Sequence, residues 1–267
     1  MISIVDVETS YQKTEHGGKD PLPFNPKNIL VSVGINDEYY FTNHTQRVDE
    51  GCYYKIQAVL DKTTLLVGHN IKFDLEWLLE AGFKYEGKVY DTMLGEYILN
   101  RGIRKSLTLD MCCKRRNLGE KSKLIQEEMD LGRSLENIDA DTVEEYGRMD
   151  VEITRKLFDS QMDDFKSEQN RGLLRTAKMM NEFLIVLTDM ERNGIYIDSE
   201  TLLSVEREYN AEFNYLRQKI AKIVYEKMGD TTINLASPEQ LSWLIYSKRP
   251  KDKNCLLYTS PSPRDYA

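Results

Sequence analysis

Residues 65–82 read LLVGHNIKFDLEWLLEAG, and this stretch decides the fold class. Its first residues are apolar without a break, which is typical of a buried strand. From Phe73 the period becomes helical, with Leu75 and Leu78 on one face. Gly82 then ends the run. A strand that passes directly into a helix indicates an α/β fold.

The sequence on either side extends this pattern. We predict further strands at residues 2–7, 29–35 and 38–42 and a helix at residues 54–60. Beyond residue 140 the strand patterns nearly vanish, and helices are predicted at residues 141–158, 171–192, 198–228 and from 237 onward. Asp141, Asp198 and Ser237 are the predicted caps of three of these helices. We therefore expect an α/β domain at 1–165 and a helical region at 166–254.

Composition excludes several classes of protein. The chain has 267 residues, 40% of them hydrophobic and 30% charged, and its net charge of −8 argues against a polycation that coats nucleic acid. No stretch approaches the roughly 20 apolar residues of a membrane span, and the first residues, MISIVDVETS, do not resemble a signal peptide. Four cysteines without metal-ligand spacing indicate reduced thiols. We predict a cytoplasmic protein without a membrane partner.

Charge is segregated in the middle of the chain. Residues 101–123 hold eight Lys or Arg against two acids, and residues 126–152 hold ten acids against two Arg. The simpler interpretation is that both stretches are solvated helix faces. The alternative is that the basic stretch contacts a phosphate backbone and part of the acidic stretch binds metal.

Two acids lie at the end of the first predicted strand. Asp6 and Glu8 are two residues apart, so their side chains share one face of the strand. Such a triplet also arises by chance, and solvent-facing acids at a strand end are the simpler alternative.

Two further motifs add acids from other elements. Asn70 and Asp74 follow the strand at 65–68, although an aspartate there could also cap the helix. Tyr146 and Asp150 share a helix face that continues as an apolar stripe through Ile153 and Leu157. Asp150 is therefore predicted to be buried. A buried carboxylate needs a metal or an ion pair, for which Arg148 and Arg155 lie on other sides of the helix.

Together the motifs give an oxygen-only set of four acids. Such ligands suit Mg²⁺ or Mn²⁺ rather than Zn²⁺. Two such ions sharing a carboxylate fit in-line displacement at phosphorus, where one positions the attacking water and the other stabilises the leaving 3′ oxygen. The hydroxyl of Tyr146 can orient that water.

The order D-x-E, N-x-x-F-D, Y-x-x-x-D resembles the DEDDy 3′–5′ exonucleases, whose fold is ribonuclease H-like, with a mixed sheet flanked by helices. Four sequence segments resemble the proofreading domain of family A DNA polymerases: VDVET, GHNIKFDLEWL, YDTMLGEYIL and YGRMDVEIT. This resemblance implies catalysis with two divalent ions at a single-stranded DNA 3′ end or on primer–template DNA. It implies the metal ligands Asp6, Glu8, Asp74 and Asp150, with Tyr146 holding the water.

The resemblance also implies substrate contacts. Thr9 is expected near the terminal nucleotide, with Asn70 and Phe73 of the second motif near the substrate strand. The family usually has a bulky apolar wedge shortly after the glutamate, but this chain has Ser10, Tyr11 and Gln12 there, so we assign the stacking role to Tyr11. In the basic stretch, Arg104 and Lys105 are the predicted backbone contacts.

The downstream sequence separates the alternatives. LIVLTDMERNGIYID and INLASPEQLSWLIY resemble the segment that joins exonuclease to polymerase and the start of the polymerase thumb. A free-standing ribonuclease D-like exonuclease acting on RNA or DNA would account for neither, and a catalytically silent module of a polymerase is the remaining alternative. The short leader before Asp6 resembles phage-type enzymes, which implies a bacterial or phage-infected host cell.

The carboxyl-terminal tail has a different character. Residues 255–265 read CLLYTSPSPRD, and one back-translation resembles a transposon-end adapter used in sequencing libraries. We therefore expect residues 255–267 to be a non-native tail on a chain truncated before the polymerase palm, and we exclude them from the fold.

Overall fold

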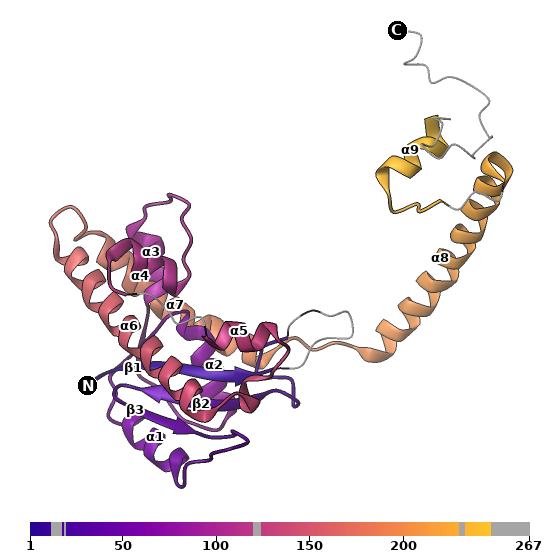
Figure 1. The fold of residues 1–267 in the computed structure, drawn as a ribbon. Helices are drawn as coiled ribbons and strands as arrows, with labels where there is room; N and C mark the ends of the chain where they lie inside the picture. The colour runs from indigo at the N-terminus through magenta and orange to yellow at the C-terminus, as the bar shows by residue number, and fades with distance from the viewer. Residues whose placement is uncertain (12–17, 19, 120–123, 230–232, 247–267) are drawn as a thin grey trace. The chain divides into compact units, whose positions relative to one another are not determined.

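Five strands form one sheet among the residues that the structure, a computed structural model, describes: 1–11, 18, 20–119, 124–229 and 233–246 (Figure 1). The strands are β1 (Ile2–Ser10), β2 (Ile29–Ile35), β3 (Glu38–Phe41), β4 (Leu65–Gly68) and β5 (Lys88–Asp91). Their spatial order is β3-β2-β1-β4-β5. β2 is antiparallel to β1 and β3, whereas β4 is parallel to β1 and β5. The predicted mixed sheet is confirmed.

Helices flank the sheet. In chain order they are α1 (Cys52–Leu60), α2 (Ile71–Glu80), α3 (Thr92–Leu99), α4 (Leu109–Arg116), α5 (Leu124–Asp130), the 3₁₀ turn η1 (Leu135–Asn137), α6 (Ala140–Lys166) and α7 (Leu173–Asn193). The sequence analysis had predicted α1, α2, α6 and α7 but not β5, α3, α4 or α5.

The alternation of β1 assigns its side chains to two separate cores. Val5 and Val7 belong to an apolar cluster with residues of α1 and α2, including Ile56. Ile4 belongs to a different cluster, which includes Phe158 of α6. Since neighbouring side chains of a strand point to opposite faces, the even-numbered positions of β1 face α6. This division places the candidate site.

The start of α6 differs from its prediction. We expected Asp141 to cap this helix, but the cap is Asp139, whose Oδ2 accepts a hydrogen bond from the Thr142 amide at 3.2 Å. Asp141 lies in the first turn, where an acid is also favourable because of the helix dipole. Two acids in such positions produce the same sequence pattern, so the pattern alone could not separate them.

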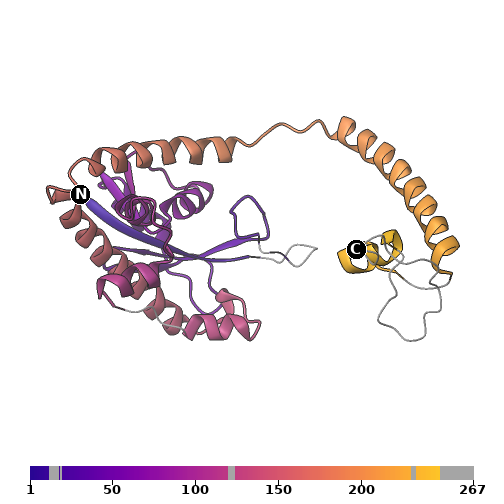
Figure 2. The same ribbon diagram turned by 90° about the horizontal axis from the view of Figure 1, so that it is seen from above.

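Contacts divide the chain into two units, Met1–Gly194 and Ile195–Ala267. The first unit extends past residue 165, where the sequence analysis placed the boundary, because α7 packs against β5, α3 and α2 (Figure 2). The side chain of Asn181 in α7 accepts a hydrogen bond from the Asp91 amide of β5 at 2.7 Å. The period of α7 showed that it has an apolar face but not which unit covers that face.

The second unit contains α8 (Ser199–Met228) and α9 (Pro238–Tyr246). The predicted cap of α8 is confirmed, because Asp198 Oδ1 accepts from the amides of Glu200 and Thr201, each at 3.1 Å. At α9, Ser237 Oγ accepts from the Gln240 amide at 3.4 Å, as its capping sequence predicted. The predicted non-native tail at 255–267 lies outside the described residues.

Candidate active site

Asp6 and Glu8 lie in β1 and face α6. The sequence analysis ended this strand at Val7, but β1 continues to Ser10, so both acids are inside the strand rather than at its end. The pairing of β1 with β2 shifts register between Glu8 and Thr9. Such an irregularity re-aims side chains locally and is common next to active sites. The backbone thus holds both carboxylates on a rigid element.

α6 brings the third carboxylate to the same place. Asp150 is 2% exposed and shares a buried stripe with Ile153 and Leu157, as the spacing predicted. The two arginines considered as partners bond elsewhere. Arg148 pairs with Glu144 and donates to the Asp37 carbonyl, while Arg155 donates to Asn36 Oδ1 at 3.2 Å. Tyr146 lies one turn before Asp150 and is half-buried.

Two glycines let α6 approach the sheet closely around Tyr39. A Cβ added at Gly147 of α6 would lie 2.4 Å from the ring of Tyr39, and one added at Gly34 of β2 would lie 3.2 Å from it. The hydroxyl of Tyr39 lies 2.7 Å from Ser32 Oγ and donates to the Val143 carbonyl of α6 at 3.3 Å. Tyr39 therefore sets the distance between helix and sheet. Sequence reasoning missed it, because nothing local distinguishes it from an ordinary strand tyrosine.

The three acids converge. One ligand oxygen from each of Asp6, Glu8 and Asp150 lies within 4.8 Å of the other two. The charge of Glu8 acts on a neighbouring hydroxyl group. Burial, and after it this charge, raises the pKa of Tyr39 well above its ordinary value. An oxygen-only set of crowded carboxylates fits a hard divalent cation, which would offset their mutual repulsion. The cluster is therefore a candidate metal centre.

Asp74 lies beside this trio. It is 3% exposed in the first turn of α2, and its Oδ1 accepts a hydrogen bond from the Val7 amide of β1 at 2.9 Å. Burial, and after it the charge of Asp6, raises the pKa of Asp74 well above its ordinary value. The fourth predicted acid thus reaches the strand that carries Asp6 and Glu8, from a separate helix.

Asp91 holds the turn that delivers Asp74. Its Oδ1 accepts hydrogen bonds from the Asn70 amide at 2.9 Å and the Met93 amide at 2.8 Å. Asn70 has a positive φ of 65°, which asparagine tolerates better than most residues. Burial raises the pKa of Asp91 to about 6. The sequence analysis missed Asp91, although it directly precedes α3 and therefore carried a cap signal.

Four of the predicted substrate residues lie in or directly beside β1 and α2. Thr9, Tyr11 and Phe73 are half-buried, whereas Asn70 is exposed at the start of α2. The structure shows these positions but does not test their roles.

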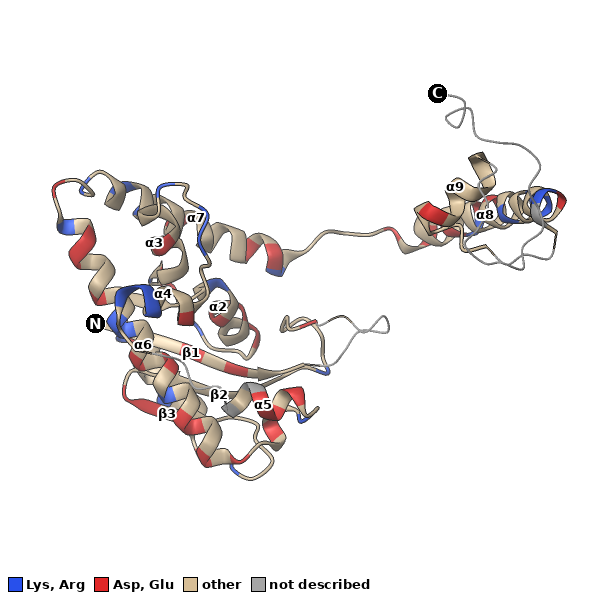
Figure 3. Cartoon of the chain, turned by 45° about the horizontal axis from the view of Figure 1, so that its top comes forward, with Lys and Arg blue, Asp and Glu red and all other residues tan. Residues whose placement is uncertain are grey.

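The basic stretch is divided between structural and solvent-facing charges. Arg115 and Arg116 in α4 bond to Glu96 of α3 at 3.2 and 3.0 Å, and are therefore structural. Arg104 and Lys105 are exposed on the loop that connects α3 to α4. In Figure 3 basic residues colour α4, while acidic residues lie along β1 and α6. Only part of the basic stretch is thus available to a ligand.

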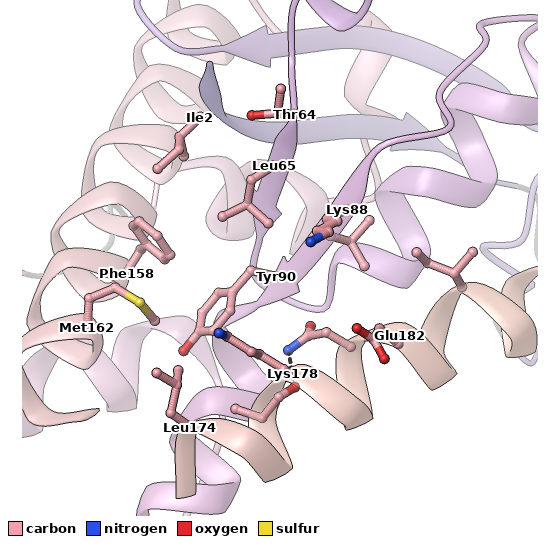
Figure 4. Close-up of a pocket in the computed structure, with 14 residues that line it drawn as sticks. Ile2, Thr64, Leu65, Lys88, Tyr90, Phe158, Met162, Leu174, Lys178 and Glu182 are labelled. Atoms are coloured by element: carbon pink, nitrogen blue, oxygen red, sulfur yellow. Dashed lines mark hydrogen bonds between the residues drawn. The ribbon is translucent and has the colours of Figure 1, made fainter. Parts of the chain in front are cut away.

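An apolar cavity lies away from the acids. About 510 Å³ in volume, it is bounded by residues at the amino ends of β1, β4 and β5 and by α6 and α7. Figure 4 shows Leu65, Phe158 and Leu174 around it, with Lys178 and Glu182 on α7. None of the predicted site residues lines this cavity.

Comparison with known proteins agrees with this geometry. The family described as "3'-5' exonuclease" matches residues 12–164, a range that starts after Asp6 and Glu8. The DNA polymerase I of Borreliella burgdorferi is 25% identical over 194 residues, which are 73% of this chain and 20% of that protein. This chain spans about a fifth of the length of the first curated relatives that it matches.

Solved structures show the same fold. The polymerase domain of Pol1 from M. smegmatis, in complex with DNA primer-template and dNTP, matches with a TM-score of 0.59 and 19% identity. That match covers 97% of this chain and 40% of that one. Escherichia coli RNase D, an exoribonuclease, matches with a TM-score of 0.50 and 14% identity over 71% of this chain and 45% of that one.

No helix in the described part of the chain has both the length and the apolarity that crossing a bilayer requires. The matched family covers more than half of the chain. This chain belongs to the family of 3′–5′ exonuclease domains found in DNA polymerase I.

Proposed function

We propose that this chain removes nucleotides from a DNA 3′ end by metal-dependent hydrolysis, as the proofreading part of a polymerase in a bacterial or phage-infected cytoplasm. The observation that carries the proposal is the convergence of Asp6, Glu8 and Asp150, whose ligand oxygens lie within 4.8 Å of one another. Carboxylates brought together from a strand and a distant helix repel one another, and a bound divalent cation would offset that repulsion.

Each residue has a distinct part in the proposal. Asp6, Glu8 and Asp150 hold one divalent ion, and Asp74, which adjoins Asp6, completes a second site. When bound, Mg²⁺ or Mn²⁺ would activate the attacking water and stabilise the leaving 3′ oxygen. Tyr146 orients the water through its hydroxyl. Thr9, Tyr11, Asn70 and Phe73 position the terminal nucleotides, because they lie in or directly beside β1 and α2, which carry three of the acids.

The test is a cleavage assay with the full chain. A 5′-labelled single-stranded DNA oligonucleotide should give a metal-dependent ladder of shortened products. Asp6→Ala or Asp150→Ala should lower the rate roughly 1,000-fold, the equivalent of several kcal/mol, because each removes a metal ligand. Asp159→Ala is the matched control, because Asp159 is exposed on the same helix as Asp150. This variant should cleave the oligonucleotide like the wild type.

The other readings predict different results. A ribonuclease D-like enzyme would shorten an RNA oligonucleotide of the same sequence faster than the DNA. A catalytically silent module would give no ladder with either substrate while its circular dichroism remained that of a folded protein. Near wild-type cleavage by Asp6→Ala or Asp150→Ala would contradict the proposed metal ligands.

A further inference from the structure

His69 links the carboxyl end of β4 to the loop between α3 and α4. Its Nε2 lies 2.8 Å from the carbonyl oxygen of Leu107, and its Nδ1 lies 2.9 Å from Thr92 Oγ1 in the first turn of α3. A carbonyl oxygen can only accept, so Nε2 must donate. Both ring nitrogens are therefore engaged, which fixes the plane of the ring and ties one end of the loop to the sheet.

The rest of this loop, residues 100–108, is also held near its ends. Arg101 donates to the Gln169 carbonyl at 2.8 Å, and Arg115 donates to the Ser106 carbonyl at 2.7 Å. Between these anchors Arg104 and Lys105 are exposed. Neither forms an ion pair or side-chain hydrogen bond within the described ranges of the chain. The loop is thus fixed at both ends and presents two exposed positive charges.

The hydrogen bond from His69 to the Leu107 carbonyl places these charges at the edge of the sheet that carries the acids. β1 and β4 are parallel, and Ile4 is paired with Val67. Asp6 and Glu8 follow Ile4, and His69 follows Val67, so both lie toward the carboxyl ends of their strands. The carboxyl ends of parallel strands meet at one edge of a sheet. His69 therefore connects the basic loop to the edge at which a phosphodiester would react.

We propose that His69 is a positioning residue for the substrate strand. By holding the Leu107 carbonyl it fixes the loop, so that Arg104 and Lys105 bind backbone phosphates of a single strand whose 3′ end lies at the carboxylates. This inference rests on the proposed function. The charges supply affinity for phosphate without base specificity, and His69 supplies their position.

The test uses two substitutions of His69 that differ in reach. In His69→Gln the amide nitrogen can occupy the position of Nε2 and still donate to Leu107. In His69→Asn the shorter amide reaches only the position of Nδ1, so the loop is released. Cleavage of a 5′-labelled oligonucleotide gives kcat and KM at several salt concentrations. The p-nitrophenyl ester of thymidine 5′-phosphate, which has no upstream phosphates, reports the carboxylate chemistry alone.

We expect His69→Asn to raise KM for the oligonucleotide roughly tenfold with an unchanged kcat, and to flatten the salt dependence of kcat/KM. The double variant Arg104→Ala/Lys105→Ala should reduce that log–log slope by roughly 1.4, the value for two phosphate contacts on a single strand. His69→Gln should behave like the wild type, and both His69 variants should hydrolyse the small ester normally. Thr92→Val, which removes the Nδ1 partner, should shift KM in the same direction by less.

The outcomes separate this inference from the proposed function. A wild-type KM and salt slope in His69→Asn, beside a reduced slope in the double variant, would overturn the role of His69 alone. An unchanged slope in the double variant would overturn the loop contact while leaving the exonuclease intact. Equal loss of ester hydrolysis in His69→Asn and His69→Gln would show that His69 supports the carboxylate centre instead. If His69→Asn does not fold, a wild-type KM in Thr92→Val contradicts the inference.

Discussion

The two longest helices among the described residues, α6 with 27 residues and α8 with 30, use the same local sequence devices with different results. Each begins at an aspartate cap and carries an apolar stripe. α6 buries its stripe, including Asp150 and Leu157, against the sheet and α4. In α8 every residue from 199 to 227 is exposed except Val224, which is half-buried. The difference teaches that periodicity identifies an apolar face, whereas its burial depends on neighbours that are distant in sequence.

The burial of the apolar stripe of α6 also positions a candidate site residue. The stripe of α6 carries a carboxylate in line with its apolar residues, and packing forces that carboxylate against Asp6 and Glu8. A polar residue on the stripe of α8 would meet no such constraint. The predictions below test whether α6 and α8 respond to substitution as this contrast requires.

The largest expected difference comes from truncating one apolar side chain in each helix. Leu157→Ala in α6 removes a fully buried side chain and should lower the free energy of unfolding by about 3 kcal/mol. Phe213→Ala in α8, where the side chain is 62% exposed, should change it by less than about 0.5 kcal/mol. Urea unfolding measures both values.

A single reporter makes that measurement specific to the first unit. The chain has two tryptophans, Trp77 in α2 and Trp243 in α9. In a Trp243→Phe background, fluorescence follows the buried Trp77 alone. Equal losses of stability from Leu157→Ala and Phe213→Ala would break the contrast between the helices.

A smaller effect is expected where α6 meets the sheet. Gly147→Ala places a methyl group against the buried ring of Tyr39, which cannot move freely because its hydroxyl is bonded to Ser32 and Val143. We expect a net loss of about 1–2 kcal/mol, since overpacking outweighs the better helix propensity of alanine. Exonuclease activity should fall as well, because the same contact sets the position of Asp150.

The matched control for this overpacking lies in α8. Asn210→Ala adds helix propensity at an exposed position without a steric conflict and should stabilise its helix by a few tenths of a kcal/mol. Thermal melting by circular dichroism compares the two variants. A Gly147→Ala protein that is as stable and active as the wild type would show that Tyr39 does not set the spacing.

The smallest effect is expected at the caps. Asp139→Ala should lower the stability of the first unit by about 1 kcal/mol, because it removes the acceptor for the Thr142 amide. Asp198→Ala should reduce helix content in the second unit and leave the unfolding of Trp77 unchanged. If Asp198→Ala shifts the Trp77 transition as much as Asp139→Ala does, the two units do not unfold independently.

Much of the site could be predicted because its motifs are local. Asp6 and Glu8 share a strand face, and Asp150 lies on a helical stripe, so their directions follow from the periods of strand and helix. The strand from 65 to 68 and the hairpin at 29–42 were predicted for the same reason. The limits of β1 and the cap of α6 were wrong by a few residues, because adjacent polar residues give equivalent local signals.

The sequence by itself determined which residues are candidates for the chemistry and which face of its element each occupies. Only the tertiary structure decided that three carboxylates converge, that Arg115 and Arg116 are structural while Arg104 and Lys105 remain exposed, and that Tyr39 and His69 hold the surrounding elements. The physical reason is the separation in sequence between the residues that interact. Local periods depend on covalent geometry within a few residues, whereas convergence, pairing and burial depend on segments that meet only after the chain has folded.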